Sequence, residues 1–188
     1  MTPSPPSPSL RISASRRERG RFGLEMTNTE IALIFLRIAE MMSYREESTF
    51  KVRAYYRAAL TLSALATPLA EVAARRALET LPGIGEAIAG KIGEILQTGT
   101  CALYERLKTE VPESIRRLLQ VPGLTPRLVR LLESEFAVTN LEAFLALARE
   151  GSLADLEGTA VKVEDAAQML RAAEGLGAFE AEREHNSP

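Results

Sequence analysis

The chain has 188 residues, of which 46% are hydrophobic, so it is long enough to bury the core of one large or two small domains. Its 23 lysines and arginines face 25 acids, which leaves a formal net charge of −2 and a pI near 5.7. That balance excludes a protein that coats nucleic acid by bulk electrostatic attraction, so any nucleic-acid contact has to be local.

The chain has one cysteine and one histidine, which limits the disulfides and metal sites that it can form. Cys101 is the only cysteine and His185 the only histidine, which excludes an intramolecular disulfide and argues against a zinc site. No window of about 18 uninterrupted apolar residues is present, and the N-terminus lacks the apolar centre of a signal peptide. We therefore expect a reduced, cytoplasmic compartment and no membrane partner.

The residue pattern predicts an all-α fold, because no alternating β-branched run reaches the length of a strand. Residues 1–25 are rich in proline and serine and then in arginine, and we expect them to be disordered. Met26 looks like a second translation start. Thr27 and Glu30 follow it at the spacing of a capping box and predict a first helix over residues 29–43.

A second helix is predicted over residues 50–65, and its opening is basic and aromatic. Three cations and two phenols occur there without an acid. Such a surface can hold a phosphate and stack on an exposed base or sugar. A solvated helical face whose tyrosines pack inward is the alternative. The five residues are Lys51, Arg53, Tyr55, Tyr56 and Arg57.

A third helix, from Pro68 through Arg76, leads into the hairpin Leu81-Pro82-Gly83-Ile84-Gly85. Gly83 and Gly85 can take positive φ, and an apolar stripe at helical spacing follows them. A glycine hairpin ahead of a helix leaves main-chain N–H groups at the positive end of the helix dipole, where they can hold a phosphate. The alternative is a tight turn without a ligand.

A second copy of the hairpin favours the phosphate interpretation. It reads Val121-Pro122-Gly123-Leu124-Thr125-Pro126, between a helix that starts at Glu113 and another apolar stripe. Thr125 stands where the first hairpin has its second glycine, and a β-branched residue resists positive φ, so we expect a distorted turn with a less available amide. Residues 156–160 suggest a third, degenerate hairpin. Between Glu113 and Glu133 the chain has no acid but four arginines, namely Arg116, Arg117, Arg127 and Arg130.

The order of the motifs over residues 28–32, 50–55 and 81–85 is similar to that in the N-terminal region of family X DNA polymerases, especially bacterial ones. The resemblance implies a lyase-like helical domain of the DNA polymerase beta type over residues 26–110, which includes the first helix-hairpin-helix. It implies the second hairpin and a degenerate third over residues 111–175, and a frayed acidic tail over residues 176–188.

In that family the first hairpin grips the downstream strand of gapped DNA and the second grips the primer strand. The resemblance also implies a monovalent cation, Na⁺ or K⁺, at hairpin carbonyls and no other cofactor. The carbonyls would be those of Leu81, Ile84, Val121 and Leu124. The DNA-binding residues would be Lys51, Arg53, Arg57, Gly83, Ile84, Gly85, Gly123, Leu124, Thr125, Arg127 and Arg130.

Lys91 occupies the position of the Schiff-base nucleophile in the deoxyribose phosphate lyases of the beta branch. Independently of this resemblance, helical spacing places Lys91 at the edge of the apolar stripe, where partial desolvation would lower its pKa. Arginine cannot form an imine, and only four of the 23 basic residues are lysines. Tyr55 would orient the sugar or the lysine. The alternative is a lysine that snorkels or touches a phosphate. Ala87 and Leu103 stand where those lyases carry phosphate-binding lysines.

Three functions remain open. The first is sequence-independent binding of gapped or nicked DNA with a 5′-phosphate in repair, the second adds lyase chemistry through Lys91, and the third is a helical interaction module that has lost DNA binding. The only aspartates are Asp155 and Asp165, so we expect no two-metal polymerase centre in this chain and consider a separately encoded polymerase domain as a partner.

Overall fold

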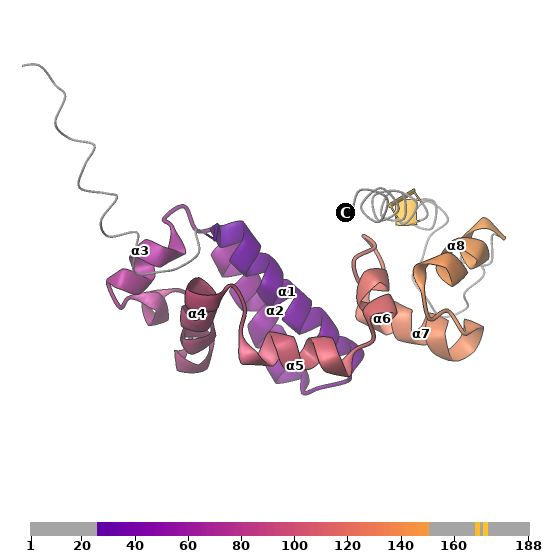
Figure 1. Cartoon of the computed structure of the whole chain (residues 1–188), viewed down its shortest axis with the longest axis horizontal. Coiled ribbons are helices and arrows are strands. Elements are labelled where there is room, and N and C mark those ends of the chain that lie inside the picture. The colour runs from indigo at the N-terminus through magenta and orange to yellow at the C-terminus, as the bar shows by residue number, and fades with distance from the viewer. Residues whose placement is uncertain (1–25, 151–167, 170, 173–188) are drawn as a thin grey trace, which may run out of the picture.

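The computed structural model describes residues 26–150, 168–169 and 171–172, and these residues form helices without a strand (Figure 1). The predicted all-α class is confirmed. The expected tails over residues 1–25 and 176–188 and the third hairpin at residues 156–160 lie outside the described residues. The elements in chain order are α1 (Asn28–Tyr44), α2 (Thr49–Ser63), α3 (Leu69–Ala74), the 3₁₀ turn η2 (Leu78–Thr80), α4 (Glu86–Thr98), α5 (Ala102–Glu110), α6 (Glu113–Leu118), α7 (Pro126–Phe136) and α8 (Leu141–Arg149).

Local capping signals set several of the helix ends. Thr27 Oγ1 accepts from the Glu30 amide at 3.2 Å, and the Glu30 carboxylate accepts from the Thr27 amide at 2.7 Å, so the predicted capping box begins α1. Gly99 ends α4 in the left-handed conformation at φ +81°. Ser48 stands at the N-cap of α2, but its side chain makes no capping hydrogen bond.

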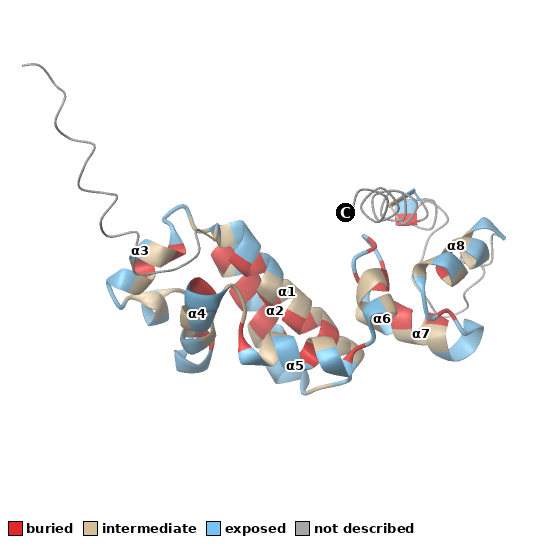
Figure 2. Ribbon diagram, in the orientation of Figure 1, coloured by how far each residue is buried: buried red, intermediate tan, exposed pale blue. Residues whose placement is uncertain are grey.

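The core is built around α1, which packs along α2 and also contacts α5 and α7. The Phe35 and Tyr55 rings stack between the first two helices with centroids 5.9 Å apart. All the buried residues except Val72 form one cluster that extends from Ile31 to Met169 and includes a residue of every helix from α1 to α8, and Figure 2 shows its buried positions along α1 and α2. The predicted boundary after residue 110 falls between α5 and α6, but the apolar core is continuous across it.

Polar contacts also join the two parts. The Tyr44 hydroxyl, at the end of α1, donates to the Glu133 carboxylate of α7 at 2.6 Å. Glu46, in the turn after α1, forms an ion pair with Arg130 of α7. None of the described helices is long and apolar enough to cross a membrane.

Candidate nucleic-acid interface

The first hairpin is a tight turn that leads directly into α4. The Ile84 amide donates to the Leu81 carbonyl at 3.1 Å, and Gly83 adopts φ +76°, as the glycine predicts. Gly85 is different. It is the N-cap of α4 in extended backbone at φ −92°, so the expectation of positive φ does not apply at this position.

The start of α4 presents three consecutive main-chain donors. The amides of Ile88 and Ala89 both turn back to the Gly85 carbonyl, at 3.0 and 2.9 Å. The N–H groups of Gly85, Glu86 and Ala87 donate to no acceptor among the described residues. Donors at the positive end of a helix dipole are able to bind an anion without a basic side chain.

An open groove of about 1130 Å³ lies over these donors, between α2, the first hairpin, α4 and α5. We call it the hairpin groove. Arg53 does not line it, and the lining residues that were not predicted as site residues include Phe50 and Arg106. An apolar residue at the start of a helix is not expected to be exposed, so the 83% exposure of Phe50 could not be predicted from the sequence. The predicted site residues that line the groove are Lys51, Tyr55, Arg57, Leu81, Gly83, Ile84, Gly85 and Lys91.

The charges in the hairpin groove cancel. Four cations line it, and so do four carboxylates, which gives a formal sum of zero. Any anion in the groove would therefore be held by the placement of individual donors rather than by a net positive field. The cations are Lys51, Arg57, Lys91 and Arg106, and the acids are Glu47, Glu79, Glu86 and Glu94.

Lys91 lies along its own helix. Its Nζ donates to the Ala87 carbonyl at 3.1 Å, one turn earlier in α4, and the residue is partly buried. This conformation keeps the amine near the N-terminal end of α4, where the Ala87 amide has no acceptor among the described residues.

Tyr55 is a core residue that also forms part of the groove wall, since it is only 9% exposed. Burial raises the pKa of its hydroxyl to about 12, with smaller contributions from Cys101 and Glu47 in the same direction and an opposing one from Arg106. The inward-packing interpretation of the tyrosines is thus confirmed for the Tyr55 ring.

The second hairpin repeats the turn of the first. The Leu124 amide donates to the Val121 carbonyl at 3.0 Å, and Gly123 adopts φ +92°. The expected distortion at Thr125 was wrong. Thr125 has φ −70° and ψ 154°, the extended conformation that the equivalent Gly85 also takes, and its hydroxyl caps α7 by accepting from the Leu128 amide at 3.2 Å.

The second hairpin nevertheless offers fewer donors. Pro126 occupies the first position of α7 and has no N–H, so only the amides of Thr125 and Arg127 remain without an acceptor among the described residues. The Met169 side chain also lies against the turn, because a Cβ at Gly123 would stand 2.8 Å from Met169 Cε. We infer a weaker anion site here than at the first hairpin.

The four-arginine stretch is partly neutralised. Arg117 forms an ion pair with Glu113 at 2.9 Å, and Arg130 forms one with Glu46, an acid from the turn between α1 and α2. Arg116 Nε donates to the Val111 carbonyl at 3.2 Å. Arg127 is exposed and has no ion pair with any described residue. Among the four, Arg127 is the one most available to a phosphate.

The hairpin carbonyls that the sequence predicts as cation ligands are only partly engaged within the described part of the chain. The Leu81 and Val121 carbonyls each accept one turn hydrogen bond and retain a second lone pair, while those of Ile84 and Leu124 accept none from the described residues. Within the described part of the chain, no group of three or more His, Cys, Asp or Glu side chains could hold a metal ion.

Comparison with known proteins agrees with this geometry. Residues 26–101 match the family model of the helix-hairpin-helix domain. The chain is 29% identical over 140 residues to the DNA polymerase/3′-5′ exonuclease PolX of Bacillus subtilis (strain 168). The match covers 74% of this chain and 24% of that protein, so the chain spans about a quarter of its relative's length. The resemblance to family X DNA polymerases is thereby confirmed, with a helix-hairpin-helix domain over residues 26–101.

Proposed function

We propose that this chain binds DNA without sequence preference, at gaps or nicks that carry a 5′-phosphate, and that it does so in DNA repair. One observation carries the proposal: three consecutive free N–H groups, at Gly85, Glu86 and Ala87, open into a groove that also holds Lys51 and Arg57. Main-chain donors of this kind contact phosphate oxygens rather than base edges, so they position DNA without reading its sequence.

The second hairpin would make a weaker contact with the other side of the gap, through the amides of Thr125 and Arg127. With few cations involved, binding should fall with salt along a modest slope. Arg53 and Arg130 remain predicted contacts outside the groove. We also propose a polymerase domain as the protein partner of this chain.

A hairpin variant tests the proposal. Gly83→Val places a β-branched side chain at φ +76° and disrupts the turn that presents the amides. Gly99→Val is the matched control, because Gly99 has a similar φ of +81° but lies at the far end of α4 and does not line the groove. Gly83→Val should lose affinity for gapped DNA in a gel shift, while Gly99→Val keeps it. An equal loss of affinity in both variants would show that the hairpin amides do not bind the DNA.

The placement of Lys91 supports a second candidate, a 5′-deoxyribose phosphate lyase, because Lys91 lines the same groove as Tyr55 and its amine is held by the Ala87 carbonyl. The amine would add to the C1′ aldehyde and lose water to form an imine. Loss of the C2′ proton to a base would then break the C3′–O bond and release the downstream strand with its 5′-phosphate, and water would hydrolyse the remaining imine to free Lys91. Borohydride trapping on an abasic-site substrate should give a covalent adduct that Lys91→Ala abolishes. No adduct with the native chain would exclude this candidate.

We also propose Na⁺ or K⁺ at each hairpin, held by the carbonyls of Leu81 and Ile84 and by those of Val121 and Leu124. Replacing KCl by the tetramethylammonium salt at equal ionic strength should then weaken DNA binding. Equal affinity in both salts would contradict the proposed cation site.

If the chain bound no DNA under any condition, the third interpretation, a helical interaction module, would be left.

A further inference from the structure

Arg106 is a cation of the hairpin groove that neither the hairpin motif nor the basic opening of α2 accounts for. It lies on α5 and faces the groove together with Lys51 and Arg57 of α2. Its guanidinium also lies near enough to the buried Tyr55 hydroxyl to oppose the rise in that group's pKa. The groove therefore has cations on two of its walls.

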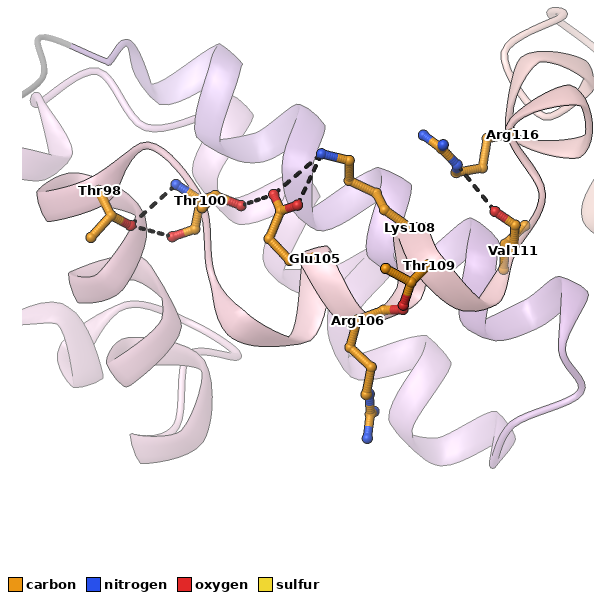
Figure 3. Close-up of polar contacts among 8 residues, drawn as sticks. All are labelled: Thr98, Thr100, Glu105, Arg106, Lys108, Thr109, Val111 and Arg116. Carbon is orange, nitrogen blue, oxygen red and sulfur yellow. Dashed lines mark hydrogen bonds and ion pairs between the residues drawn. The ribbon is translucent and has the colours of Figure 1, made fainter.

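The Arg106 guanidinium is weakly engaged within the protein. Its ion pair with Glu110, one turn later in α5, is long at 3.8 Å, and the other Glu110 carboxylate oxygen is held by Arg45. Figure 3 shows the Arg106 side chain extending away from the Glu105–Lys108 pair on the same helix. The arginine is thus available to a ligand on the groove side.

A terminal phosphate needs more positive charge than an internal one. A phosphate monoester carries about −1.5 to −2 charges near neutral pH, whereas a backbone diester carries one. Because the groove sums to zero charge, the amides and Lys51 have to hold the phosphate against the nearby carboxylates of Glu47 and Glu86. An arginine on the α5 wall supplies a planar pair of donors that fits two phosphate oxygens at once.

We propose that Arg106 binds the terminal 5′-phosphate from the α5 side of the hairpin groove and so sets the preference for a phosphorylated end over a hydroxyl end. This inference rests on the proposed DNA-binding function and assigns end recognition within it to a residue outside the hairpin. The free amides hold phosphate in either case, whereas Arg106 distinguishes a dianion from a monoanion.

The test compares the full chain and Arg106→Gln on gapped duplexes whose downstream end carries a 5′-phosphate or a 5′-hydroxyl. Loss of a two-bond contact to a charged group should reduce the preference for the phosphate by about ten-fold and change the affinity for the hydroxyl end by less than about two-fold. Arg106→Lys should retain part of the preference. Lys108→Gln is the control, since Lys108 is on the same helix, pairs with Glu105 at 3.0 Å and does not line the groove.

The outcomes separate the two proposals. A native chain that prefers the phosphorylated gap and an Arg106→Gln variant that keeps that preference would overturn the inference and leave the proposed function standing. Equal loss of affinity for both ends would also overturn it, because Arg106 would then be a general backbone contact. A native chain that binds neither duplex would contradict the proposed function itself. Arg106 is 59% exposed, so its replacement should leave the fold unchanged, and circular dichroism of the variant checks this.

Discussion

The aliphatic stem of Arg57 lies against Gly83 at the turn of the first hairpin, where a Cβ on the glycine would stand 2.9 Å from Arg57 Cδ. Gly83 also has φ +76°, so Gly83→Ala should cost about 1–2 kcal/mol of unfolding free energy and displace Arg57. Gly85→Ala, at φ −92° with nothing within 4 Å of its Cβ, should change stability by less than about 0.5 kcal/mol. Urea denaturation of both variants measures the difference, and equal stabilities would contradict the turn geometry.

Glu86 stands among the free amides of α4, where its charge opposes a bound phosphate but favours the helix dipole. Glu86→Gln should therefore raise affinity for gapped DNA by roughly three-fold while lowering stability by about 0.3–1 kcal/mol. Glu142→Gln, in the first turn of α8 and outside the groove, should lower stability by a similar amount without changing affinity. Weaker DNA binding by Glu86→Gln would show that the phosphate does not approach the start of α4.

Lys91→Arg separates the two roles of the Lys91 side chain. Arginine keeps the positive charge but cannot form an imine, because its guanidinium remains protonated. If Lys91 is a nucleophile, the variant should bind the gapped duplex about as well as the native chain and give no borohydride adduct. An adduct that persists in Lys91→Arg would place the imine on another amine.

Tyr44 and Tyr55 should make the fold sensitive to alkali. Burial is the main cause that raises each pKa from 10.0 to about 12, and the hydrogen bond to Glu133 adds to it at Tyr44. A folded pKa above the unfolded one gives stability that is fully present below the unfolded value. That stability is lost as the pH rises from about 10 toward 12.

The double variant Tyr44→Phe/Tyr55→Phe should therefore show a flatter dependence of unfolding free energy on pH over that range. Denaturant titrations at neutral and alkaline pH measure it. The same slope in the native chain and in the double variant would show that neither hydroxyl is held neutral by the fold.

Helix ends can be predicted from the sequence where capping residues lie close to the end that they set. The Thr27–Glu30 box, the Asn140 cap that accepts from the Ala143 amide at 2.8 Å, and the left-handed Gly99 each lie within a few residues of the end that they set. Thr125 was misjudged because the motif alone suggests that both glycines need positive φ. In the folded hairpins only the first of the two positions requires it.

Only part of the candidate site could be predicted from the sequence. Lys51, Arg57 and Lys91, three of the predicted site residues, line one groove. Arg106 reaches that groove because α5 and α2 both pack on α1, and Glu46 neutralises Arg130 from a turn that is distant in sequence. Such contacts depend on tertiary packing, which residue spacing does not encode.

The central claim is that the hairpin groove holds a 5′-phosphate at a gap in DNA. The most direct measurement is the affinity of the full chain for a one-nucleotide gapped duplex with and without that phosphate, in moderate salt. We predict tighter binding to the phosphorylated gap. Equal affinity for the two duplexes, or no binding at micromolar protein, would contradict the claim.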